Sequence, residues 1–168
     1  GGSSLERITK DFPQFEFVPA NFFMWSPHEL AIYYDTKRVK KNDGLIALVH
    51  EIGHATLDHR LYRFDAELLK MEMDAWDEAR KLAERYGLTV DEDHIARCIK
   101  TYDDWLTKRA TCPDCSNFSL QRGRDEYSCF GCGAVWQVNW RKDRRVTRKV
   151  VERYEHPVLQ FAEKVEPK

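Results

Sequence analysis

The sequence predicts an α+β fold, in which a small sheet and about three helices are followed by a small β module rich in cysteine. Three observations predict it. The segment ELAIYYDTKRV at residues 29–39 has the β-branched and aromatic residues of a strand. The three segments that follow it repeat apolar residues with the period of a helix. The last third of the chain carries two C-x-x-C pairs among short strand-like stretches.

The composition allows one compact core and a small satellite, because the chain has 168 residues of which 42% are hydrophobic. We expect two domains, residues 5–109 and residues 110–168. Charged residues make up 33%, but the net charge is only -1, which excludes a molecule-wide attraction to nucleic acid or acidic lipid. No apolar run approaches the roughly 20 residues that span a bilayer, so we expect no membrane segment.

The first elements are the least regular. Residues 5–26 mix aromatic residues and prolines without a clear period, which indicates short strands or irregular packing. Residues 29–39 are expected to form an edge strand that runs toward a turn at residues 41–44. From Asp43, a plausible N-cap, a helix is expected to continue to about His59. One side of this helix carries Ile46, Ala47, His50, His54, Leu57 and Leu61.

Two further helices are expected. The second runs from about Arg63 to Tyr86, where Gly87 provides a C-terminal stop, and the third runs from about Asp91 to Lys108. An acid, Glu72, lies in the middle of the apolar stripe of the second helix. That stripe consists of Leu68, Leu69, Ala75, Trp76, Ala79, Leu82, Ala83 and Tyr86, and the stripe of the third helix consists of Ile95, Cys98, Ile99, Tyr102, Trp105 and Leu106.

The segment LVHEIGHATLDH places His50 and His54 one helical turn apart, so that both imidazoles can hold one zinc ion. Glu51 is rotated by about 100° from His50. It is therefore expected to take a proton from a water molecule beside the metal rather than to bind the metal, as in the H-E-x-x-H metalloproteases. The alternative is a pair of hydrogen-bonded core histidines with Glu51 on the surface.

A catalytic zinc of this kind needs a third protein ligand and one open position. Asp58 lies too far along the helix from His50, and His59 points away from the histidine face if the helix persists. Glu72 is the better candidate, because a carboxylate in an apolar stripe is costly to bury unless a metal or a cation pairs with it. Alternatively, the head of Glu72 reaches solvent at the flank of the helix; Asp74 is the second choice of ligand.

The residues DGLIALVHEIGHATLDH and EMDAWDEA resemble those of the ImmA/IrrE-type metallopeptidases, over about residues 29–87. That family has a similar HEIGH core on its active helix and takes its third ligand from an E-x-x-A pattern on the next helix. The resemblance implies a zincin-like domain in which His50, His54 and Glu72 bind a catalytic zinc and Glu51 is the general base. It also implies protein substrates such as regulators of stress responses or of mobile elements.

Four cysteines form two C-x-x-C pairs separated by 13 residues, which is typical of a structural zinc site closed by four thiolates. The segment resembles a zinc ribbon, in which Gly131 and Gly133 are expected to adopt positive φ. Zinc-bound thiolates favour a reducing compartment, so we expect the protein to be cytoplasmic. The four cysteines are Cys112, Cys115, Cys129 and Cys132.

Residues 136–149 combine Trp136 and Trp140 with six Lys or Arg residues between Arg141 and Lys149. A basic stripe beside exposed aromatic rings can neutralise phosphates and stack bases, so contact with DNA or RNA is one prediction for this segment. Solvated charges on a last strand or helix are the alternative.

Three functions are compatible with these patterns. The leading hypothesis is a zinc metalloendopeptidase that acts on a protein substrate and holds one catalytic and one structural Zn²⁺. The second is a SprT-like, DNA-associated protease, a family that also joins H-E-x-x-H to a C-terminal zinc ribbon but takes its third ligand from a downstream histidine, for which His59 and His94 are the candidates. The third is a non-catalytic nucleic-acid-binding or scaffold protein that uses the ribbon and the Arg-rich segment.

Overall fold

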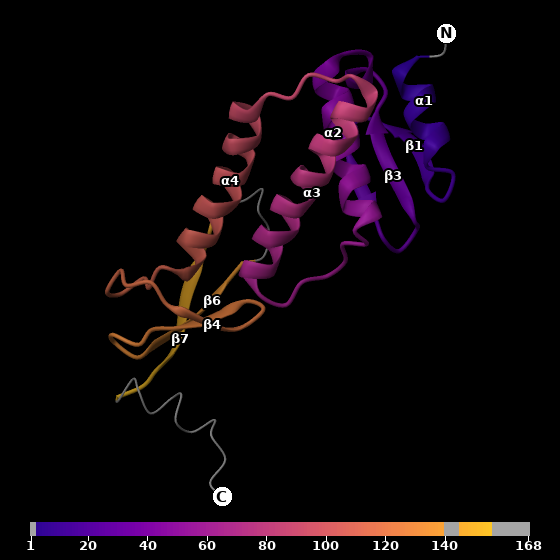
Figure 1. The fold of residues 1–168 in the computed structure, drawn as a ribbon. Coiled ribbons are helices and arrows are strands. Elements are labelled where there is room, and N and C mark those ends of the chain that lie inside the picture. Colours follow the sequence, from indigo (N-terminus) through magenta and orange to yellow (C-terminus); the bar gives the residue numbers. More distant parts are fainter. Residues whose placement is uncertain (1–2, 140–144, 156–168) are drawn as a thin grey trace, which may run out of the picture. The chain divides into compact units, whose positions relative to one another are not determined.

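The computed structural model describes residues 3–139 and 145–155, and its fold is α+β, as predicted (Figure 1). These residues contain four α-helices, a sheet of three strands and a sheet of four strands. The contacts of the chain divide it into two compact units. The first unit comprises residues 1–61 and 68–99, and the second comprises residues 62–67 and 100–168. These units are defined by contacts within the chain and do not test the predicted domain boundary. The boundary expected near residue 110 therefore stays a prediction.

The sheet of the first unit has the strand order β1-β3-β2. β1 (Glu16–Ala20) runs parallel to β3 (Ala31–Asp35), and β2 (Met24–Ser26) runs antiparallel to β3. The prediction of an edge strand at residues 29–39 was therefore wrong, because β3 is the central strand. The sequence did not reveal its second neighbour because β1 contains Pro19, which is tolerated at a sheet edge but weakens the pattern of a strand.

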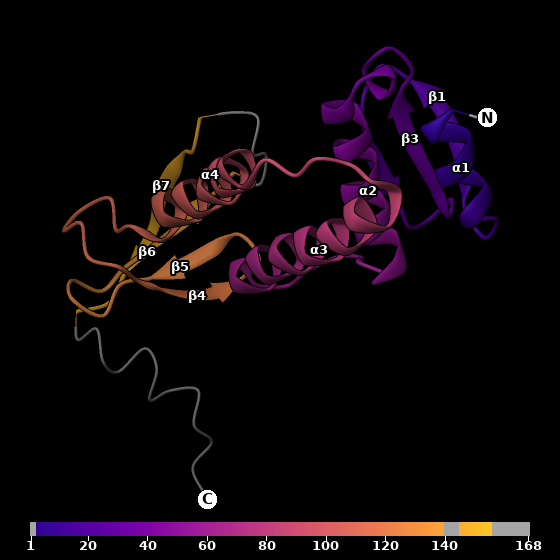
Figure 2. The ribbon, with the colours of Figure 1, turned by 45° about the horizontal axis from the view of Figure 1, so that its top comes forward.

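Helix α1 (Ser4–Asp11) forms where only strands or irregular packing were expected. Ser3 caps it, because its hydroxyl accepts a hydrogen bond from the backbone N–H of Glu6 at 3.2 Å. Ile8 anchors the helix, since its side chain is 0% exposed in the core of the first unit. Figures 1 and 2 both show the sheet lying between α1 and α2. The helix has only eight residues, too few for its apolar period to stand out.

Helix α2 (Asn42–Thr56) follows a short 3₁₀ turn, η1 (Arg38–Lys40). It begins inside the expected turn, so Asp43 is not the N-cap but lies in the first turn, where a carboxylate favours the helix dipole. It ends before the expected end, and Leu57 and Leu61 are consequently exposed instead of joining its buried face. That face carries Leu45, Ile46, Leu48, Val49, Ile52, His54 and Ala55.

Helices α3 (Asp65–Tyr86) and α4 (Glu92–Ala110) begin and end within two residues of the predicted positions. Gly87 stops α3 with a φ of 67°, as expected. The stripe of α3 is buried from Ala75 to Tyr86, whereas Leu68 and Leu69 are half-buried. No helix in the described part of the chain is both long enough and apolar enough to cross a membrane.

The second unit contains the antiparallel sheet β4-β5-β6-β7, seen beside the C-terminal half of α4 in Figure 2. Trp136 on β6 is 0% exposed, and its indole N–H donates to the carbonyl of Arg109 at 3.0 Å. The expectation that Trp136 offers an exposed ring for base stacking was therefore wrong, and Trp140 lies outside the described residues. The strands are β4 (Leu120–Gly123), β5 (Glu126–Ser128), β6 (Ala134–Val138) and β7 (Arg148–Arg153).

A buried ion pair organises the core of the second unit. The guanidinium of Arg109, which is 1% exposed, lies 3.0 Å from the carboxylate of Asp65. The hydroxyl of Tyr127 donates to the same carboxylate, and Arg109 also donates to the carbonyls of Arg124 and Asn139. A buried charge is tolerated only when it is paired and hydrogen-bonded in this way.

The hydroxyl of Tyr86 at the end of α3 donates to the carboxylate of Asp11 at 2.7 Å and so ties α3 to α1. Burial and this hydrogen bond raise the pKa of Tyr86 to about 12. Because the folded-state pKa exceeds the ordinary value of 10.0, the tie contributes its full stability below pH 10 and loses it as the pH rises through 12.

We therefore expect Tyr86→Phe to lower the free energy of unfolding by about 1–3 kcal/mol at neutral pH, the range for a hydrogen bond to a charged group. Near pH 12 the difference between wild type and variant should be much smaller. Urea unfolding followed by circular dichroism at both pH values measures the two differences. An equal difference at both pH values would show that the ionisation of Tyr86 does not affect the free energy of unfolding.

Candidate metal centres

His50, His54 and Glu72 form a group that can hold a metal ion, since one ligand atom from each lies within 4.8 Å of the others. The Nε2 atoms of the two histidines are 3.2 Å apart. The carboxylate oxygens of Glu72 lie 3.2 Å from Nε2 of His50 and 3.0 Å from Nε2 of His54. Ligands placed about 2.0–2.1 Å from a tetrahedral ion would be about 3.3 Å apart, close to this spacing.

The burial of Glu72 removes the alternative in which its head reaches solvent, because the residue is 6% exposed. Burial alone would raise the pKa of Glu72, but hydrogen bonds from His50 and His54 outweigh it and hold the pKa well below its usual range. Burial likewise opposes the charge on His54, yet the hydrogen bond to Glu72 leaves the pKa of His54 raised. The carboxylate is thus ionised, as a metal ligand must be.

The other acids considered in the sequence do not belong to this group. Asp74, the second choice, accepts a hydrogen bond from the ammonium of Lys70 at 2.7 Å. Asp58 is exposed, pairs with Arg60 at 3.0 Å and has a φ of 53°, so it lies in the turn that follows α2 and not on the helix. Glu72 is therefore the acid that the fold brings to the two histidines.

Gly53 allows the backbones of α2 and α3 to come close enough for this grouping. A Cβ atom at position 53 would lie 2.6 Å from the carbonyl oxygen of Ala75, a backbone atom that has little freedom to move. The spacing matters for the site because Gly53 directly precedes His54 and Ala75 lies one turn beyond Glu72. The glycine within the HEIGH sequence thus has a packing role.

Glu51 stands beside the group without joining it. One of its carboxylate oxygens, Oε2, accepts a hydrogen bond from the backbone N–H of Trp25 in β2 at 3.0 Å. Burial is the main cause that raises the pKa of Glu51, while His50, His54 and the Trp25 N–H act in the opposite direction. A carboxylate whose pKa is raised toward neutrality is a better proton carrier near neutral pH.

His59 contacts His54 on the Nδ1 side of its ring. Its Nδ1 atom lies 2.9 Å from Nδ1 of His54, and its carbonyl accepts the indole N–H of Trp25 at 2.9 Å. His59 was expected to point away only if the helix persisted, and it does not, because α2 ends at Thr56 and the turn at Asp58 brings the chain back. If Nε2 of His54 binds a metal, its Nδ1 carries the proton and donates it to His59, which fixes the orientation of the ring.

His50 is held by stacking instead of by a second hydrogen bond. Its ring centroid lies 3.9 Å from that of Trp76, and the two planes are inclined by 25°. Its Nδ1 atom is buried and has no hydrogen-bond partner among the described residues. Trp76 also contacts His94, whose ring meets that of Trp76 edge-on with 6.2 Å between the ring centroids. His94 thus contacts Trp76 and is not a member of the metal-binding group.

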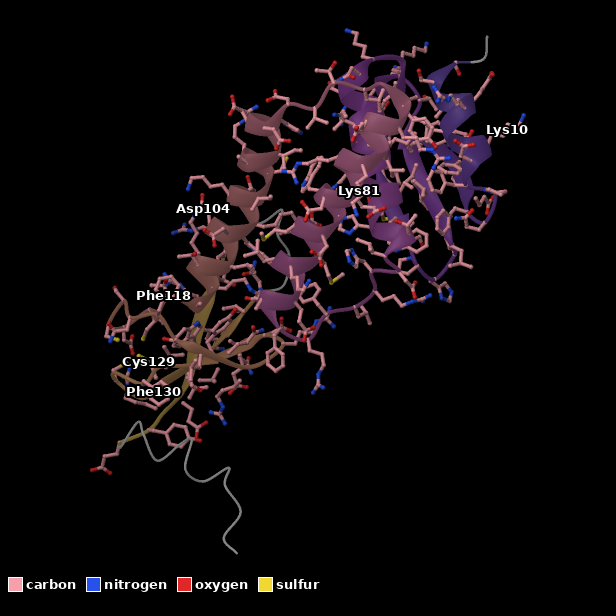
Figure 3. All side chains as sticks on the ribbon, viewed as in Figure 1. Lys10, Lys81, Asp104, Phe118, Cys129 and Phe130 are labelled. Atoms are coloured by element: carbon pink, nitrogen blue, oxygen red, sulfur yellow. The ribbon has the colours of Figure 1, made fainter. Side chains whose placement is uncertain are left out.

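The four cysteines form a second group that can hold a metal ion. The Sγ atoms of Cys112 and Cys132 are 3.6 Å apart, and those of Cys115 and Cys129 are 3.4 Å apart. None of them forms a disulfide. Sulfur atoms about 2.3 Å from a tetrahedral ion would be about 3.8 Å apart, so the four thiols surround a space of suitable size. Figure 3 shows Cys129 in the second unit, near Phe118 and Phe130.

Each C-x-x-C pair closes a tight turn. The N–H of Ser116 donates to the carbonyl of Cys112 at 3.0 Å, and the N–H of Gly133 donates to that of Cys129 at 3.1 Å. Gly133 has a φ of 78°, as predicted. Gly131 does not have positive φ, so that prediction was wrong; its N–H instead donates to Sγ of Cys129 at 3.3 Å. Such N–H donors stabilise a thiolate.

Comparisons with known proteins do not extend these observations. No family model, no curated protein and no solved structure matches the chain. The candidate centres therefore rest on the residues and on their geometry.

We expect purified protein to bind two divalent ions per chain, one in each group. Glu72→Gln should lose one of the two ions and keep the other, because an amide is a poor ligand and carries no charge to balance the ion. Cobalt substitution distinguishes the sites, since only the thiolate site gives sulfur-to-cobalt charge-transfer bands. Asp74→Asn is the matched control on the same helix and should retain both ions. Loss of an ion in Asp74→Asn but not in Glu72→Gln would transfer the assignment to Asp74.

We also expect Gly53→Ala to weaken the His50 site, because the added methyl forces α2 and α3 apart. Overpacking of this kind costs roughly 1–3 kcal/mol of stability. Gly123→Ala is the control, since a Cβ at position 123 meets no atom within 4 Å. Thermal unfolding and metal titration of both variants measure the effects. If Gly53→Ala matched wild type in both, the close approach would not be required.

Proposed function

We propose that this protein is a zinc-dependent metalloendopeptidase that hydrolyses peptide bonds in a protein substrate, with a zincin-like domain of the ImmA/IrrE type. The observation that carries the proposal is the group of His50, His54 and Glu72 with Glu51 beside it. Two imidazoles and one carboxylate are the ligand set of thermolysin-like catalytic zinc sites, and three ligands leave the fourth position open. A structural site would use four ligands.

A zinc ion held there would act as a Lewis acid and lower the pKa of a water in the open position to near 7. Glu51 is suited to accept the proton of the attacking water and to pass it to the leaving amine. Its Oε2 is held by the Trp25 N–H, while Oε1 has no hydrogen bond within the described residues. The hydrogen bond therefore orients the carboxylate and leaves one oxygen for proton transfer.

The third ligand favours the ImmA/IrrE type over the SprT-like alternative. The SprT-like family uses a downstream histidine in this role. His59 contacts the Nδ1 side of His54, which is opposite to the Nε2 atom that faces Glu72. His94 packs against Trp76. The position of Glu72 thus supports the E-x-x-A pattern, in which the acid lies on the helix after the H-E-x-x-H helix.

The four thiols would hold a second, structural zinc that stabilises the ribbon without taking part in hydrolysis. Four sulfur ligands fill the coordination of the ion and leave no place for water. The five cysteines form no disulfide, so a cytoplasmic location, where thiols stay reduced, is part of the proposal.

Cleavage tests the proposal directly. Zinc-loaded protein incubated with a mixture of unfolded proteins should generate new amino termini, which mass spectrometry identifies. Glu51→Gln should keep both metal ions and slow cleavage by about 10²–10⁴-fold, the usual contribution of a general base.

Glu84→Gln on the exposed side of α3 is the control for the same change of charge and should cleave at the wild-type rate. Removal of zinc by a chelator should abolish cleavage, and added zinc should restore it. Cleavage that persists unchanged in Glu51→Gln would reject the catalytic role. A protein that binds both ions but cleaves nothing would favour the non-catalytic scaffold.

A further inference from the structure

A cavity of about 590 Å³ lies in the second unit, between α4 and the start of β7. Among the described residues, its lining includes three cationic side chains and one acid, which sum to a charge of +2. The lining residues are Thr101, Asp104, Trp105, Lys108, Arg145, Val146 and Arg148. Figure 3 marks the position of Asp104 on α4. None of these lining residues belongs to either candidate metal centre.

The positive charge of the lining is available to a ligand. The carboxylate of Asp104 lies 3.0 Å from the ammonium of Lys100, so its charge is already balanced. Arg148 donates to the carbonyl of Thr111 at 2.7 Å, which fixes its position and leaves its charge unpaired. Lys108 and Arg145 have no acidic partner among the described residues. Cationic side chains that form no ion pair within the protein can bind an anionic ligand.

The wall of the cavity also contains a polar group without a partner. Trp105 is 6% exposed, and its indole N–H has no hydrogen-bond acceptor among the described residues. The guanidinium of Arg109 packs over the ring at 4.6 Å, but its charge is paired with the carboxylate of Asp65. Because Trp105 is buried, its ring is not available for stacking on a base. The described part of the site therefore offers cations and a donor but no exposed aromatic ring.

The exposed cations continue beyond the cavity along the chain. Arg145 and Lys149 are four residues apart, which is up to roughly 14 Å of extended backbone. Lys149 is exposed on β7, directly after Arg148. A single phosphate would need donors that converge on it. A polynucleotide presents a regular series of closely spaced negative charges, whereas an acidic peptide carries fewer charges on mobile side chains.

We propose that this cavity and the adjoining start of β7 bind the sugar-phosphate backbone of a nucleic acid, without reading its bases. Lys108, Arg145 and Arg148 contact the phosphates. Recognition depends on charge, because no exposed aromatic ring is among the described residues that line the site. This inference does not rest on the proposed peptidase function.

Binding is measured by fluorescence anisotropy of a labelled oligothymidylate of about 15 nucleotides, titrated at several salt concentrations. The test variant is Lys108→Gln with Arg145→Gln, because both side chains are exposed and line the cavity. The matched control is Lys10→Gln with Lys81→Gln, which removes two exposed cations from the first unit; both are labelled in Figure 3.

Wild type should bind with an affinity that falls as salt rises. Each lost phosphate contact should reduce the slope of log K against log salt by about 0.7, so the test variant should lose about 1.4 in slope and bind about tenfold more weakly at low salt. The control should keep the wild-type affinity and slope. An oligoadenylate of the same length should bind within about twofold, because no base is read.

Several outcomes would overturn the inference. They include no binding at low salt, an unchanged affinity in the test variant, and an equal loss in the control. Displacement by inorganic phosphate at constant ionic strength would reveal a small-anion pocket, and equal competition by polyglutamate would reveal an acidic polypeptide as the ligand. Both metal contents are measured in every variant, so a folding defect is recognised. The binding experiment does not measure cleavage. A negative binding result would therefore overturn the nucleic-acid inference without bearing on the peptidase proposal.

Discussion

The close approach of α2 and α3 is the constraint on which the histidine site depends. Two imidazoles from one helix and a carboxylate from the next reach a common point only when the helix backbones nearly touch, and the contact between Gly53 and the carbonyl of Ala75 is where they do. A buried carboxylate would otherwise destabilise the core, since an unpaired charge is costly away from water. The packing that brings the helices together thus also supplies Glu72 with its partners, and fold and site stabilise one another.

Features set by short-range spacing could be predicted from the sequence. The pairs His50 and His54, and the two C-x-x-C turns, each lie within a few residues, and a helix or a tight turn fixes their geometry almost without regard to the rest of the chain. The role of Glu72 could be predicted for a different reason. An acid inside an apolar stripe is costly to bury, so it requires a cationic or metal partner. The lengths of α3 and α4 followed from long, regular apolar periods, which are the strongest local signal.

Features set by the three-dimensional path of the chain could not be predicted. The roles of His59 and Trp25 depend on the early end of α2 and on the placement of β2 beside Glu51, neither of which has a local signal. Trp136 alternates with polar residues as an exposed ring would, yet it is buried because α4 supplies the carbonyl of Arg109 to its indole N–H. In each case, a contact between segments distant in sequence decides the role of the side chain.

The ion pair of Arg109 and Asp65 links the four-cysteine sheet to residues that precede it in the chain. Both residues precede Cys112, the first of the four clustered cysteines, and Asp65 does so by more than forty positions. Their charged groups are nevertheless buried and bonded to Tyr127, a member of the hydrophobic core that contains Cys112 and Cys129. A piece of chain cut just before Cys112 would leave the hydroxyl of Tyr127 and the carbonyls of Arg124 and Asn139 without the groups they bond to. The sheet and its four cysteines thus depend on the start of α3 and the end of α4, and a fragment that begins at Cys112 would lack both.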